Sequence, residues 1–167
     1  MKTSGAEMKD MSDPYLGLIS FVDAYKWGVI APRACMIHKD LKFLLDTASD
    51  GVSRMTFAAI AADNQVKGYA VYIWTDPYKG LPCVSVGYAV AKSFRNQGVA
   101  TDILRKSISE MQMGLKKKAP KFYVDAIVAN ENVASIKVAT KVLCATPIDM
   151  IEEISGKSSS RFFKLVE

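Results

Sequence analysis

Residues 84–104, with the sequence VSVGYAVAKSFRNQGVATDIL, have the pattern of a strand, a short loop and the start of a helix. The strand alternates large side chains with the small Ser85, Gly87 and Ala89. We therefore predict one face that packs in a core. The other face leaves room either for a ligand close to the backbone or for a closely packed helix.

The helix is predicted over 99–115, because apolar residues recur there at helical spacing: Val99, Ile103, Leu104, Ile108, Met111 and Leu115. Polar residues between them, including Glu110, are predicted to face away from the core. The helix opens with the run Arg95-Asn96-Gln97-Gly98-Val99-Ala100. A helix start offers unpaired N–H groups and a positive dipole end, so this run is predicted to bind a pyrophosphate.

Length and composition bound the other possibilities. The chain has 167 residues, half of them hydrophobic, which predicts one domain over 13–167 behind a flexible tail over 1–12. The net charge of +5 suits either an ordinary solvated surface or an anionic ligand. A nucleic-acid partner is not favoured, because the one basic run, 116–118, ends the predicted helix, where lysines complement the dipole.

Three separated cysteines and one histidine predict neither a disulfide framework nor a metal site. No targeting segment and no apolar run of about 20 residues is visible. The chain is therefore predicted to be cytoplasmic, with no contact to a membrane.

The remaining elements are assigned from periodicity. Helices are predicted over 14–28, 38–48 and 133–143, and strands over 53–62, 66–75, 83–91, 121–129, 147–154 and 161–166. The residues over 76–82 are predicted to form a loop, because they are dense in turn residues. This order of elements predicts an α/β domain with a mixed sheet.

Two motifs resemble those of the GNAT superfamily of N-acetyltransferases. Arg95-x-x-Gly98-x-Ala100 is similar to its acetyl-coenzyme A motif, and Asn132-x-x-Ser135 is similar to the motif of the ribosomal-protein N-terminal acetyltransferase branch. The resemblance covers 53–167. It implies a single α/β (α+β) GNAT-like domain with a mixed, mostly antiparallel sheet of about six to seven strands flanked by helices.

The resemblance also implies how acetyl-CoA, the co-substrate, is held. The implied contacts are the backbone of Ala89 and Val90 for the pantetheine arm, and Arg95, Gln97, Gly98, Val99, Ala100 and Thr101 for the pyrophosphate. Asn132 would bind the pantetheine or a water, and Ser135 would lie near the departing thiolate. Lys137 is either a contact to the 3′-phosphate or an ordinary solvated lysine.

The implied reaction is direct attack of an amine on the thioester. Many members place a glutamate where this chain has Ser85, so the general base is predicted to be water or another carboxylate. We expect Asp125, which interrupts an apolar strand, ahead of Glu131, Glu152 and Glu153. The predicted proton donor is Ser135, with Tyr88 as a reserve whose alternative role is core packing.

The acceptor is predicted to be the amine of a small molecule or of a protein N-terminus. Its site would be lined by the two predicted N-terminal helices, the loop over 76–82 and the last hairpin. The aromatic residues Tyr25, Trp27, Trp74 and Tyr78 either shape this site or pack in the core or on the surface. Two alternatives remain: a catalytically silent acyl-CoA sensor, and a toxin-type acetyltransferase acting on aminoacyl-tRNA. The sequence is also compatible with a homodimer.

Overall fold

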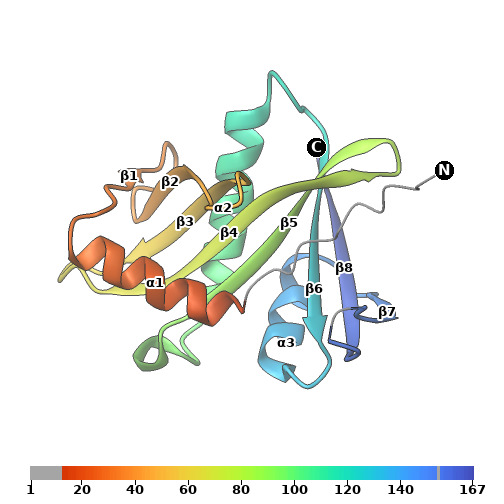
Figure 1. Cartoon of the computed structure of the whole chain (residues 1–167). Coiled ribbons are helices and arrows are strands. Elements are labelled where there is room, and N and C mark those ends of the chain that lie inside the picture. The colour runs from red at the N-terminus through yellow and green to blue at the C-terminus, as the bar shows by residue number, and fades with distance from the viewer. Residues whose placement is uncertain (1–12, 154) are drawn as a thin grey trace.

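The computed structural model describes residues 13–153 and 155–167, so the predicted tail over 1–12 lies outside the described residues. One eight-stranded sheet has the order β1-β2-β3-β4-β5-β6-β8-β7 (Figure 1). Its strands are β1 (Arg33–Ala34), β2 (Leu41–Thr47), β3 (Ser53–Ile60), β4 (Val66–Tyr78), β5 (Leu81–Val90), β6 (Phe122–Ala129), β7 (Ile148–Ile151) and β8 (Ser158–Val166).

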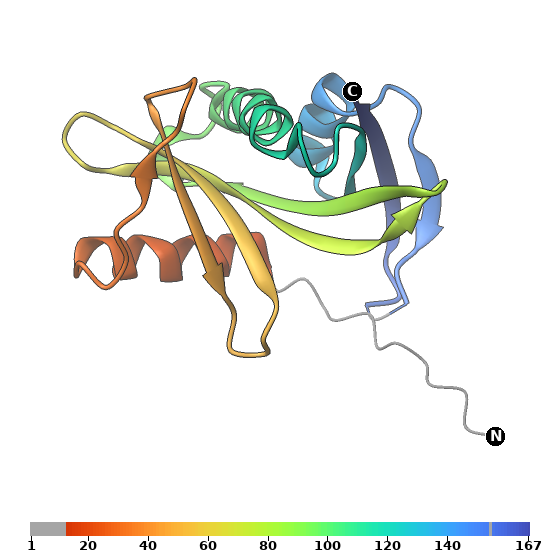
Figure 2. The same ribbon diagram turned by 90° about the horizontal axis from the view of Figure 1, so that it is seen from above.

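Among the described residues, three α-helices cover the two faces of this sheet. These are α1 (Pro14–Lys26), α2 (Val99–Leu115) and α3 (Val133–Val142), with a short 3₁₀ turn, η1, at Lys92–Phe94. Figure 2 shows α1 on one face and both α2 and α3 on the other. The larger core lies under α2 and α3, and a smaller one, around Leu18, Phe21 and Tyr69, lies under α1.

The predicted fold class is confirmed as a single mixed domain. Every pairing recorded in the sheet is antiparallel except that of β5 with β6, and α2 provides the crossover between those two strands. The helix predicted over 99–115 is α2, which begins at Val99 and ends at Leu115. None of the helices in the described ranges is long and apolar enough to span a membrane.

The helix predicted over 38–48 is wrong, because residues 41–47 of this range form strand β2. Leu41 and Phe43 face the larger core and Leu44 faces the smaller one, as alternation in a strand requires. Pairing with β3 over seven residues supplies backbone hydrogen bonds that the leucine spacing alone does not reveal. Together with the two-residue β1, this strand raises the sheet above the six to seven strands expected.

The loop predicted over 76–82 is also wrong, because β4 runs to Tyr78 and β5 begins at Leu81. An irregularity between Thr75 and Tyr78 accommodates Asp76 and Pro77 within the strand. The turn itself is Lys79 and Gly80, both at positive φ. Tyr78 stacks on Phe163 of β8, with ring centroids 3.7 Å apart. This contact packs the end of the β4–β5 hairpin against β8.

Glu110, which was predicted to face away from the core, is only 7% exposed. Its carboxylate accepts the backbone N–H groups of Met36, Ile37 and His38 at 3.0, 2.7 and 2.6 Å. These three residues connect β1 to β2. Glu110 of α2 therefore supplies the hydrogen-bond acceptor for the backbone N–H groups of this connection.

Candidate functional site

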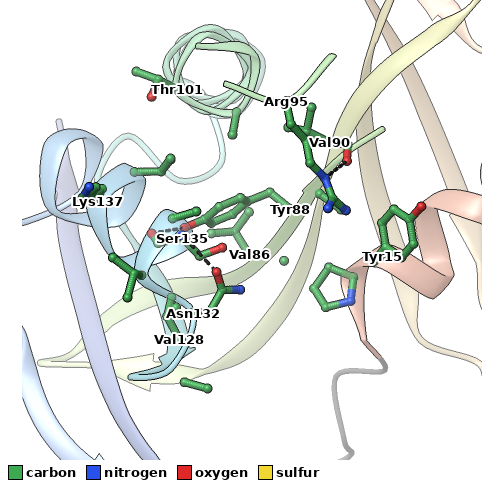
Figure 3. A pocket seen from close by; sticks show the side chains of 18 of the residues that line it. Tyr15, Val86, Tyr88, Val90, Arg95, Thr101, Val128, Asn132, Ser135 and Lys137 are labelled. Atoms are coloured by element: carbon green, nitrogen blue, oxygen red, sulfur yellow. Dashed lines mark hydrogen bonds between the residues drawn. The ribbon is translucent and has the colours of Figure 1, made fainter. Parts of the chain in front are cut away.

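The feature that positions the site is a split in the sheet. The parallel strands β5 and β6 pair only from Cys83 to Ser85, opposite Tyr123 to Asp125. Beyond Ser85 the two strands separate, and a cavity of about 830 Å³ occupies the opening. It is walled by residues of β5, β6 and the first turns of α1, α2 and α3 (Figure 3).

The structure brings most of the predicted cofactor residues to this cavity. Of the predicted cofactor residues, those that line it are Ala89, Val90, Arg95, Gly98, Ala100, Thr101, Asn132, Ser135 and Lys137. Gln97 and Val99 are not among the lining residues. The Gln97 amide donates to the Ser93 carbonyl at 3.2 Å, and Val99 packs against the larger core.

Gly98 caps the N-terminus of α2 with a left-handed backbone, at φ 74° and ψ 9°. A Cβ built there would meet no atom within 4 Å, so conformation and not crowding explains the glycine. No side chain of residues 13–153 or 155–167 caps this helix start. The N–H groups of its first turn have no intrahelical acceptor, and they lie at the positive end of a 17-residue helix.

Arg95 lies at the edge of the cavity nearest α1. Its Nε donates to the Val90 carbonyl at 3.3 Å, and its guanidinium lies 5.1 Å from the ring of Tyr15 (Figure 3). Because that contact involves the first turn of α1, Arg95 connects the loop before α2 to α1. The sequence motif gave no signal for this second contact.

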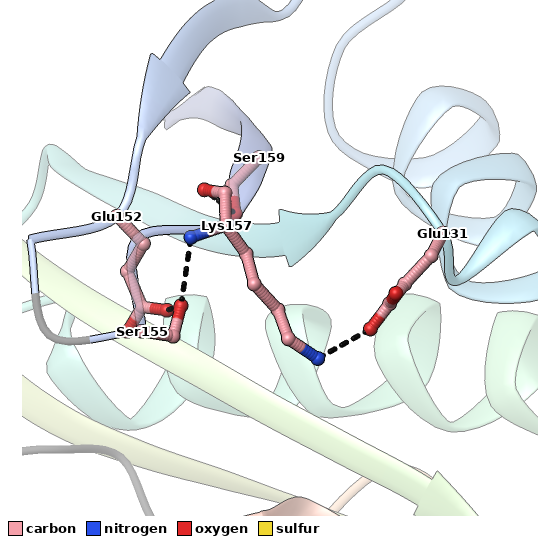
Figure 4. Close-up of polar contacts among 5 residues, drawn as sticks. All are labelled: Glu131, Glu152, Ser155, Lys157 and Ser159. Atoms are coloured by element: carbon pink, nitrogen blue, oxygen red, sulfur yellow. Dashed lines mark hydrogen bonds and ion pairs between the residues drawn. The ribbon is translucent and has the colours of Figure 1, made fainter.

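The opposite wall is the start of α3. Asn132 caps this helix, with its Oδ1 accepting the Ser135 N–H at 3.1 Å. The Tyr88 hydroxyl donates to the Ser135 carbonyl at 2.8 Å (Figure 3), and burial raises the Tyr88 pKa. Figure 4 shows the adjoining turn, where Glu131 pairs with Lys157 at 2.5 Å and so joins the start of α3 to the β7–β8 turn.

The structure places Asp125 away from the cavity. It is 1% exposed, is not among the lining residues, and accepts from Arg161 through Oδ2. Glu131 and Glu152 are engaged by Lys157 and Ser155, respectively (Figure 4). Neither they nor Glu153 lines the cavity.

Within the described ranges, the one carboxylate that lines the cavity is Asp13, which sequence reasoning missed. It caps α1, with Oδ1 accepting the Tyr15 N–H at 2.9 Å. An aspartate followed by proline before an apolar helical run is a start signal, so the cap was predictable from the sequence. Its place beside β5 depends on how α1 packs.

None of the four aromatic residues expected around the acceptor lines this cavity. Trp27 and Trp74 are exposed, Tyr25 stacks on Phe21, and Tyr78 stacks on Phe163. A second cavity of about 540 Å³ lies beneath α1, and Pro14 and Gly87 line both cavities.

Comparison with known proteins agrees with this arrangement. A model of the acetyltransferase (GNAT) domain family matches residues 36–142. No curated protein sequence matches the chain.

Two solved structures share the fold. A chimera of the Vibrio cholerae spermidine N-acetyltransferase SpeG and hSSAT has 16% identity and a TM-score of 0.54 over 67% of this chain and 66% of that chain. The Vibrio cholerae spermidine N-acetyltransferase in complex with CoA and spermine has 15% identity and a TM-score of 0.51, over 67% and 65%. The match thus spans slightly under two-thirds of each of those two solved chains. The likeness to the ribosomal-protein branch stays a prediction.

Proposed function

The chain belongs to the acetyltransferase (GNAT) domain family, and we propose that it transfers the acetyl group of acetyl-CoA to the nitrogen of an amine. The observation that carries this proposal is the cavity in the split between β5 and β6. It joins the start of α2 to the start of α3, the two places where the acetyl-CoA motifs lie.

The residues around the cavity fit an acetyl-CoA molecule. Beyond Ser85, the edge of β5 that faces β6 has no strand partner in the described part of the chain, so its backbone can pair with an amide-bearing arm such as pantetheine. The first turn of α2 offers unpaired N–H groups for a pyrophosphate. Lys137 lines the same cavity and adds a positive charge for the remaining phosphate.

When bound, acetyl-CoA supplies an activated acetyl group as a thioester. The amine must be neutral to attack it, and the thiolate that departs needs a proton. We assign proton donation to the Ser135 hydroxyl, and we assign to Tyr88 the positioning of the Ser135 backbone. For the proton lost by the amine, Asp13 is the acceptor that the cavity offers, alongside water.

The acceptor that we propose is the amine of a small molecule or of a protein N-terminus. The related Vibrio cholerae structure holds spermine, a polycation. In this chain Asp13 is the one carboxylate at the cavity within the described ranges, which offers little to a polycation. A long polyamine is therefore not the acceptor that we favour.

Two measurements on the purified chain test the proposal. Calorimetry should show heat of binding with acetyl-CoA, and free thiol should appear when a panel of amines is added. If no heat is seen at high micromolar acetyl-CoA, the proposal is lost. Binding without turnover across the whole panel would instead favour a catalytically silent acyl-CoA sensor, a role that Ser85 at the usual glutamate position also suits.

A further inference from the structure

The ion pair of Asp125 and Arg161 lies on the face of the sheet that carries α1. Asp125 projects from β6 and Arg161 from the neighbouring β8, and both Nε and Nη2 of the arginine donate to Oδ2 of the carboxylate. The two partners differ in access to solvent. The Asp125 side chain is 1% exposed, whereas that of Arg161 is 36% exposed.

This pair is a poor source of stability. Burying a carboxylate costs free energy that a single ion pair often fails to recover. Here Oδ1 of Asp125 has no hydrogen-bond partner, and it is the one buried side-chain polar atom of the described residues in that condition. The pair therefore needs an explanation other than stabilisation of the fold.

The pair does hold Arg161 in one orientation. Asp125 engages two of its five N–H donors, and the guanidinium also lies 4.6 Å from the centroid of the Phe163 ring. Phe163 is itself fixed by its stack on Tyr78. The remaining donors of Arg161 have no partner within the described ranges, and the side chain is partly exposed, so these donors form a preorganised fork that a ligand can reach.

Arg161 is not itself among the residues that line the cavity, but its strand neighbour is. Arg161 is the register partner of Ile127, which lines the cavity where β5 and β6 have separated. Asp125 is the register partner of Ser85, at the last paired position before the split. The register thus places Arg161 on the strand next to the β6 wall of the cavity.

We propose that Arg161 binds a carboxylate of the acceptor, so that the acceptor is an amino-carboxylate: one small molecule with an amine and a carboxylate. A fixed guanidinium recognises a carboxylate through two parallel hydrogen bonds, which a flexible ammonium cannot reproduce. Asp125 acts as a positioning residue through Arg161. This inference rests on the proposed acetyl transfer, and it excludes simple polyamines as good acceptors.

The first test uses the wild-type chain and matched acceptors. The panel pairs glycine, β-alanine and 4-aminobutyrate with their carboxamides, and adds spermidine and a short peptide with an acidic side chain. We expect kcat/KM for at least one free amino-carboxylate to exceed that for its amide by roughly tenfold or more. Equal rates for acids and amides, or a preference for spermidine or the peptide, would overturn the inference.

The second test uses Arg161→Lys, which keeps the charge beside Asp125 but loses the fork. The KM for the preferred amino-carboxylate should rise by roughly tenfold or more, while the calorimetric Kd for acetyl-CoA stays unchanged. Asp125→Asn should raise the same KM with little change in kcat. An unchanged KM in both variants would contradict the inference. If the wild-type chain bound no acetyl-CoA at all, the proposed function would fail first, and the two failures are thereby distinguished.

Discussion

The Tyr88 hydroxyl donates a 2.8 Å hydrogen bond to the backbone carbonyl of Ser135 and so joins β5 to the first turn of α3 across the cavity. Burial raises the pKa of Tyr88, which keeps the phenol protonated and able to donate at neutral pH. A tyrosine held in this way is better suited to fix the position of Ser135 than to give up its own proton. In the proposed mechanism Tyr88 is therefore the positioning residue and Ser135 the proton donor.

Tyr88→Phe should separate those two roles. The variant keeps the ring in the core and loses one hydrogen bond, so the free energy of unfolding should fall by about 1 kcal/mol. If Tyr88 only positions Ser135, kcat should fall by a few-fold, whereas loss of a general acid would lower it by about 100-fold or more. Tyr72→Phe is the matched control, because its hydroxyl bonds to Ser107, which does not line the cavity. Its kcat should match that of the wild type.

Gly98 provides a test of the phosphate cradle. Any residue other than glycine must adopt an unfavourable left-handed backbone conformation there, at a cost of about 1–2 kcal/mol, although a Cβ at this position would contact no other atom within 4 Å. Gly98→Gln and Gly98→Glu share this cost and nearly the same bulk, so they differ in charge alone. We expect the Kd for acetyl-CoA, measured by calorimetry, to rise at least roughly tenfold more in the Glu variant. Equal Kd values in the two variants would show that the phosphates do not bind at this helix start.

Asp13→Asn tests the carboxylate at the cavity. Asparagine caps a helix about as well as aspartate, so α1 should keep its stability while the cavity loses its negative charge. With Asp13 accepting the proton of the amine, kcat/KM should fall by about tenfold or more, and the Kd for acetyl-CoA should not change. A wild-type rate in this variant would leave water as the proton acceptor. Thermal unfolding of the same samples checks that the cap is intact.

Some elements of this protein are set by local sequence, and others are set by tertiary contacts. The helix over 99–115 was predicted with its bounds because an apolar stripe and a glycine at its start are both local signals. Residues 41–47 carry leucines at spacings that fit a helix or a strand, and pairing with β3 decides for the strand. The same limit applies to the site. Asp125 was predicted as a base because it is polar in an apolar strand, but its contact with Arg161 is set by the register of β6 and β8.

Glu110→Gln tests the one buried glutamate of α2. Its two carboxylate oxygens accept three backbone N–H groups from residues 36–38, and charged acceptors form the stronger hydrogen bonds. The amide of glutamine replaces one oxygen with a donor that faces another donor. The free energy of unfolding from urea titration should therefore fall by about 2 kcal/mol.

Asp102→Asn is the matched control for this prediction, because Asp102 lies on the same helix with its side chain 53% exposed and pairs with Lys106. Exposed pairs of this kind contribute roughly 0–1 kcal/mol, so that variant should unfold close to the wild type. Residues 36–38 do not line the cavity, so Glu110→Gln should bind acetyl-CoA with an unchanged Kd while it remains folded. A stability equal to that of the control would show that the connection between β1 and β2 is held by other contacts.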